Sequence, residues 1–164
     1  MKFRKPYLIS MLIVSATTIA AVETASAAKV RMSGSGCLAM LNQSTEASKL
    51  VRNNDNVTNN GTTNLSISCP LPNTFTATTT VTPFVEWSDG STSTEVGCGM
   101  RRMANSAYEY VGGTQSYKTT GVASTLGRTK KVLPSGSVYA GDALAMECIL
   151  PPNQKGNVYH YGYE

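Results

Sequence analysis

Few residues of this 164-residue sequence could do catalytic chemistry, and His160 is its single histidine. A histidine-dependent triad would need His160 beside a nucleophile and a carboxylate, and the sequence has no G-x-S-x-G nucleophile elbow. A pair of carboxylates could instead hydrolyse a glycosidic bond. The scattered candidates for such a pair are Glu86, Asp89, Glu95, Glu109, Asp142 and Glu147. The sequence favours a protein that is not an enzyme, with a carboxylate-dependent hydrolase as the enzymatic alternative.

Aromatic residues near the end of the chain offer a different chemistry, which is recognition. Tyr159, Tyr161 and Tyr163 alternate with other residues, so a regular strand would place the three phenols on one face. On a solvent-facing sheet this row could bind sugar rings, because tyrosine combines a flat apolar body with a polar tip. On an inner face the same row would be core. Trp87 is the candidate addition to such a platform.

The four cysteines predict two disulfides rather than a metal site. Cys37, Cys69, Cys98 and Cys148 make an even number, which in an exported chain is typical of structural disulfides. No C-x-x-C pair occurs, so zinc chelation is not indicated, and we expect no metal or cofactor. Four cysteines allow three connectivities, and the strands that carry them help to choose among these.

The first residues predict export. Lys2, Arg4 and Lys5 precede an apolar stretch over residues 7–22, and Ala25-Ser26-Ala27 follows as an A-x-A cleavage site. The apolar stretch is short for a membrane span, so we expect none in the mature chain. The chain is then secreted or periplasmic.

Cleavage after Ala27 divides the chain into a signal peptide, 1–27, and a single secreted domain, 28–164. The signal peptide carries three of the 14 basic and one of the 10 acidic residues, so the net charge falls from +4 to +2. Because no concentrated basic face remains, we expect no binding to nucleic acid.

The elements that position these residues are short strands. From Thr63 onward apolar and polar residues alternate with period two. Faces of single strands are formed by Leu65, Ile67, Cys69 and Leu71; by Val81, Val85 and Trp87; by Val96, Cys98 and Met100; and by Leu144, Met146, Cys148 and Leu150. Residues 30–41, 107–111, 127–133 and 157–163 offer further strands, whereas the polar run 53–61 predicts a surface loop.

An antiparallel β-sandwich of about seven or eight short strands accounts for this pattern. Cys98 and Cys148 are both central in strong strands, so we pair them. The remaining disulfide is then Cys37–Cys69.

Several short motifs together resemble those of small secreted bacterial two-disulfide β-sandwich proteins. They are Cys69-Pro70-Leu71, the strand that ends in Asp89, the Cys98 strand, residues 148–152 and the closing Tyr161-Gly162-Tyr163-Glu164. The resemblance implies the fold and the compartment, and it implies no catalytic or ligand-binding residue.

The functional hypotheses follow from these features. The first is a non-enzymatic structural or surface-associated protein. The alternative is a carbohydrate-binding or adhesin-like module that uses the tyrosine face. The expected partners are a polysaccharide, a cell-surface polymer or another copy of the chain.

Overall fold

The computed structural model describes residues 29–40, 47–89, 96–104, 107–113, 117–118 and 128–164. The expected signal peptide and its cleavage site lie outside these residues. Regular structure in the described part is antiparallel strand, apart from two short 3-10 turns, η1 (Gly34–Gly36) and η3 (Ala47–Lys49). Among the described residues, no helix has the length and apolar character needed to cross a bilayer.

One sheet is organised around its long strand β14, and we call it the β14 sheet. In spatial order its strands are β11 (Thr129–Val132), β7 (Pro83–Asp89), β14 (Gly156–Tyr163), β4 (Val57–Asn59) and β3 (Leu50–Arg52), with β1 (Val30–Ser33) also paired to β14. On the side away from β7, β14 pairs first with β4, through Asn157 and Val158, and then with β1, through residues 160–163. Its register with β7 shifts between Val158 and His160, so a β-bulge marks the change of partner.

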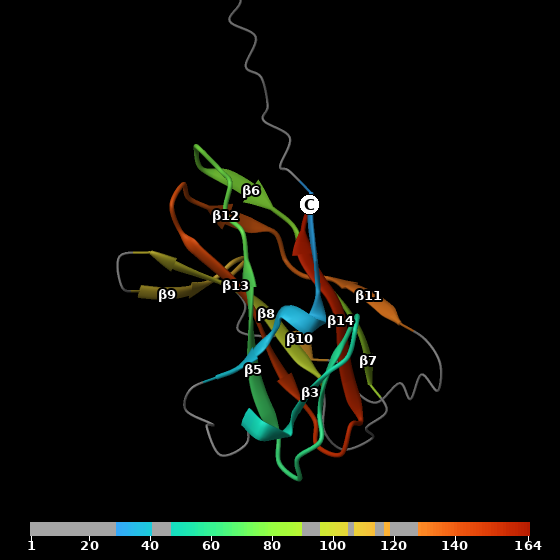
Figure 1. The fold of residues 1–164 in the computed structure, drawn as a ribbon. Coiled ribbons are helices and arrows are strands. Elements are labelled where there is room, and N and C mark those ends of the chain that lie inside the picture. Colours follow the sequence, from blue (N-terminus) through green and yellow to red (C-terminus); the bar gives the residue numbers. More distant parts are fainter. Residues whose placement is uncertain (1–28, 41–46, 90–95, 105–106, 114–116, 119–127) are drawn as a thin grey trace, which may run out of the picture.

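The other sheet, which we call the β13 sheet, faces it across the core (Figure 1). Its strands in order are β10 (Tyr117–Lys118), β8 (Gly97–Ala104), β13 (Ala143–Leu150), β5 (Leu65–Leu71) and β2 (Leu38–Ala39), with β9 (Ala107–Tyr110) also paired to β8. A small two-stranded sheet of β6 (Thr79–Val81) and β12 (Gly136–Val138) caps the top end in Figure 1. The structure therefore confirms the antiparallel β-sandwich.

Alternation along the strands builds the core between the sheets. In β5 and β13 every second residue is buried, and these residues are the apolar set that the sequence pattern placed on one face. Leu65, Ile67 and Leu150 are fully buried. Removing such a side chain from water contributes about 1.5–3 kcal/mol, so these few residues matter to a fold of this size.

Both predicted disulfides are present, and both lie within the β13 sheet. Cys98 and Cys148 are directly opposite each other on β8 and β13, with 4.1 Å between their Cα atoms. Cys37 precedes β2 and bonds to Cys69 on β5, with a Cα–Cα distance of 4.0 Å. The bonds thus join neighbouring strands rather than the two sheets. Two disulfides are compatible with an extracellular location.

The polar run 53–61 is a loop only in part. Its residues 57–59 form β4, and all three are buried. Asn59 makes this burial acceptable, because its amide nitrogen donates to the carbonyl of Leu150 at 3.2 Å and its amide oxygen accepts the N–H of Gly61 at 2.8 Å. A buried polar side chain costs little when backbone groups satisfy it. The prediction therefore holds for residues 53–56, which form the turn between β3 and β4, and is wrong for residues 57–59.

Candidate functional site

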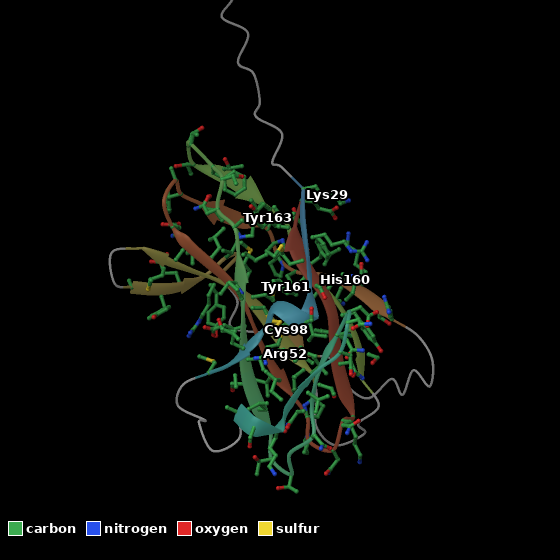
Figure 2. All side chains as sticks on the ribbon, viewed as in Figure 1. Lys29, Arg52, Cys98, His160, Tyr161 and Tyr163 are labelled. Atoms are coloured by element: carbon green, nitrogen blue, oxygen red, sulfur yellow. A yellow bond between two sulfur atoms is a disulfide. The ribbon has the colours of Figure 1, made fainter. Side chains whose placement is uncertain are left out.

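The tyrosine row proposed as a binding platform does not form a surface. Tyr161 and Tyr163 are 0% exposed and point from β14 into the space between the sheets (Figure 2). The Tyr161 hydroxyl donates to the carbonyl of Pro70 at 3.1 Å, and the Tyr163 hydroxyl donates to that of Pro72 at 2.8 Å. Burial raises the pKa of both phenols, which keeps them protonated as donors. These rings tie β14 to the end of β5, so the platform hypothesis is wrong for them.

Tyr159 leaves the row because of the bulge in β14. Val158 is buried and His160 points outward, so the extra residue between them also lies on the outer side. The guanidinium of Arg128 stacks on the Tyr159 ring, 4.3 Å from its centroid. Trp87, the other candidate for the platform, pairs with Val158 across β7 and β14 and is only 2% exposed. It is a core residue as well.

A groove of about 700 Å³ lies instead on the outer face of the β13 sheet. Its floor is made of small side chains that neighbouring strands direct outward, Ser68, Ala143 and Ala145. Residues 38–40 form one wall at the edge of the sheet, and Leu38 in this wall is 56% exposed. The face is hollow because small residues occupy its middle and larger ones its edge. The volume is within the range of ligand pockets, about 300–1,000 Å³.

The opposite wall is aromatic and cationic. Met103 of β8 and Tyr108 of β9 lie opposite each other in the ladder, and Tyr108 is 65% exposed. Arg101 shares this face, with its guanidinium carbon 5.4 Å from the centroid of Tyr108 and 4.8 Å from that of Tyr110. Arg101 thus makes a cation–π contact with each of the two rings. Tyr108 keeps ring surface that a ligand in the groove could contact.

An ion pair crosses the floor beside this wall. Arg101 Nη1 lies 2.9 Å from each carboxylate oxygen of Glu147, which β13 supplies. Burial lowers the pKa of Arg101, but the hydrogen bond and charge of Glu147, together with Tyr110, raise it overall above its ordinary value. The Nε of Arg101 is buried and has no hydrogen-bond partner within the described part of the chain. The groove thus holds charged donors and acceptors next to an exposed ring.

One end of the groove is fixed by a second arginine. Arg102 forms ion pairs with Glu109 and with Asp142, the latter at 3.6 Å between Nη1 and Oδ2. Its guanidinium also stacks on Tyr139, 4.3 Å from the ring centroid. Asp142 in turn accepts the backbone N–H of Tyr139 at 3.0 Å. These contacts hold the turn before β13 against the end of β8.

The structure separates the candidate carboxylates that it describes. Glu147 lines the groove, and Glu109 and Asp142 contact Arg102 at its end. Glu86 lies on the β14 sheet, 3.1 Å from His160 Nδ1. Glu95 and the side chain of Asp89 fall outside what the structure describes. Among the described residues, no group of three or more His, Cys, Asp or Glu side chains could hold a metal ion.

Sequence reasoning did not identify the groove because its residues come from distant segments. Arg101 and Glu147 are 46 residues apart and meet only through the β8–β13 ladder. A signal was nevertheless present, since Tyr108 and Tyr110 alternate along a predicted strand as Tyr161 and Tyr163 do. Tyr161 and Tyr163 are buried, whereas Tyr108 is exposed. Alternation within one strand does not indicate which of its two faces the sheet buries.

The comparisons with known proteins concern the fold. The chain matches no family model and no curated protein sequence. A family 35 carbohydrate-binding module from Clostridium thermocellum is similar in structure, with a TM-score of 0.52 at 11% identity over 84% of this chain and 98% of that one. At this identity, the likeness shows a shared β-sandwich fold.

Two further modules score slightly lower. A CBM35 from Paenibacillus barcinonensis has a TM-score of 0.49 at 13% identity. The C-terminal CBM6 of a marine laminarinase from Zobellia galactanivorans has a TM-score of 0.48 at 11% identity. Both comparisons cover 82% of this chain and 98% of the other.

Proposed function

We propose that this chain is a carbohydrate-binding module that holds a glycan in the groove of the β13 sheet. The observation that carries the proposal is the exposed ring of Tyr108 beside the Arg101–Glu147 ion pair. A sugar ring offers an apolar face for stacking and hydroxyl groups around its rim. Tyrosine and an Arg–Glu pair match these two kinds of surface.

The fold supports the same proposal. The Clostridium thermocellum structure, which is a carbohydrate-binding module, shares the β-sandwich over most of both chains. This support favours the carbohydrate-binding alternative over the structural role that the sequence suggested first. The binding face that we propose differs from the tyrosine row, because that row is buried.

Export remains part of the proposal. A signal peptide over residues 1–27 would bring the domain to extracellular or cell-wall polysaccharides, and the two disulfides are suited to that environment.

The test is retention of the oxidised protein on a panel of insoluble polysaccharides, compared with Tyr108→Ala. We expect the variant to lose about tenfold or more in affinity, since a buried aromatic contact contributes about 1.5–3 kcal/mol. Tyr159→Ala is the matched control, because Tyr159 also stacks on an arginine but lies on the other outer face. Its affinity should stay within about twofold of the parent, a change below 0.5 kcal/mol.

Two results would count against the proposal. If the parent protein binds no polysaccharide of the panel, the structural role becomes the better account. If Tyr159→Ala weakens binding and Tyr108→Ala does not, the glycan binds at the β14 sheet instead.

A further inference from the structure

Each guanidinium group at the groove already has a carboxylate partner. Arg101 is paired with Glu147, while Arg102 is paired with Glu109 and Asp142. Among the described side chains at this site, two guanidinium groups therefore face three carboxylates. A ligand meets no guanidinium here that lacks a carboxylate partner.

The Arg101–Glu147 pair is placed where a ligand would contact it. Both residues line the groove, and their side chains are 28% and 17% exposed. Glu147 Oε1 and Oε2 lie at the same distance, 2.9 Å, from Arg101 Nη1, so the carboxylate turns both oxygens toward the guanidinium. The Nε of Arg101 is buried. The remaining lone pairs of Glu147 and the Nη N–H groups of Arg101 can bond to polar groups on a sugar.

A neutral hydroxyl fits this pair without breaking it. One hydroxyl can donate to Glu147 while its neighbour on the same ring accepts from Arg101, and the ion pair stays closed. A sugar carboxylate can bind Arg101 only by displacing Glu147 or by lying beside it. Either arrangement places a like charge near Glu147 in a partly enclosed site, which disfavours binding.

We infer that the Arg101–Glu147 pair makes the groove selective for neutral glycans and that Glu147 is the residue that excludes acidic ones. The inference rests on the proposed function, since it names the class of glycan that the same groove takes. In this arrangement Tyr108 stacks on the sugar ring, and the ion pair forms hydrogen bonds with the hydroxyl groups of that ring.

The experiment compares matched neutral and acidic polymers. Glucan, mannan and galactan are each tested beside the same polymer oxidised at C6 to the uronate, so that the members of a pair differ only in the carboxylate. The parent protein should prefer the neutral member of any pair it binds by about tenfold or more, as expected for a charge-assisted hydrogen bond.

Glu147→Gln keeps the shape of the side chain and removes its charge. We expect the preference to fall to about twofold or to reverse, because Arg101 then becomes available to the uronate. Glu147→Asp retains the charge and should retain rejection of the uronate. Glu86→Gln is the matched control, since Glu86 is also paired with an arginine at 2.9 Å but lies on the β14 sheet.

The outcomes separate the inference from the proposed function. If the parent binds neutral glycans but Glu147→Gln leaves the preference unchanged, or if the parent prefers the uronate, the inference is overturned and glycan binding stands. If the parent binds no member of any pair and no other polysaccharide, both are overturned. The melting temperature of each variant shows whether a loss of binding reflects unfolding, and Glu147→Asp then carries the comparison.

Discussion

The two sheets of the sandwich are stabilised by different means. The β13 sheet contains both disulfides, which connect strand β5 to the segment before β2 and strand β8 to β13. The β14 sheet has neither, and its outer face is crossed by ion pairs. Arg31 on β1 reaches Glu86 on β7 at 2.9 Å, and Lys130 on β11 reaches Glu164 at 2.9 Å.

The outer faces of the two sheets also differ. On the β14 sheet the charged side chains bond to one another across the strands, so that face helps to hold its own strands together. On the β13 sheet the middle of the face is left open by Ser68, Ala143 and Ala145. The β13 sheet also has cross-strand ion pairs, Arg101–Glu147 and Arg102–Glu109, and its two disulfides add covalent links between neighbouring strands.

The largest effect should come from removing a disulfide. The double variant Cys98→Ala, Cys148→Ala should lower the free energy of unfolding by about 4 kcal/mol, because its closed loop of about 50 residues constrains the unfolded chain. Amide hydrogen exchange should accelerate more in β8 and β13 than in β14. Equal acceleration in both sheets would contradict a specific role of this disulfide in the β13 sheet, since it would mean that the bond stabilises the whole fold uniformly.

A smaller effect should come from the tie between the sheets. Tyr161→Phe removes the hydroxyl that donates to the carbonyl of Pro70 and so breaks this contact between the sheets. We expect a loss of about 1 kcal/mol in the free energy of unfolding, measured by urea denaturation. Tyr159→Phe, on the outer side of the same strand, should change it by less than about 0.5 kcal/mol. A similar loss in both variants would argue against an inter-sheet role for the Tyr161 hydroxyl.

The smallest effect should be the pH dependence of the ion pairs on the β14 sheet. Hydrogen bonds from Lys29 and Lys130 lower the pKa of Glu164 from 4.5 to about 2. A lowered pKa in the folded state means that this contribution is fully present above pH 4.5 and is lost as the pH falls through 2.

The measurement is the urea midpoint of the parent and of Glu164→Gln between pH 4.5 and pH 2. The difference between the two should shrink as the pH falls, and it should be modest because the pair is on the surface. Glu109→Gln provides an exposed carboxylate of the β13 sheet for comparison. A difference that stays constant with pH would show that the lysines do not stabilise the folded state through this carboxylate.

Local sequence patterns predicted the longer strands and their inward faces, because burial on one face of a strand imposes period two. Two predictions were wrong: the segment 30–41 contains two strands, β1 and β2, and Val81 lies in β6 rather than in β7 with Val85. They also led to the correct disulfides, since Cys98 and Cys148 lie on the same face of their strands as the neighbouring apolar residues. Both successes depend on information within single strands.

The errors arose where distant residues decide the structure. Asn59 is buried in β4 because Leu150 and Gly61 supply its partners, and nothing near Asn59 in the sequence identifies the first of these. The groove combines strands β2, β5, β8, β9 and β13. Its residues could not be selected from the sequence before the order of the strands was known.

The bulge at Tyr159 separates the length of β14 from the phase of its buried residues. If Tyr159 is skipped, β14 reads as an unbroken alternation in which Val158, Tyr161 and Tyr163 face inward and His160 faces outward. Tyr159 is therefore the one extra residue of β14 relative to β7, and the bulge accommodates it without changing the inward phase of the residues on either side. Deletion of Tyr159 should therefore shorten the strand on its outer side and leave Val158, Tyr161 and Tyr163 facing the interior.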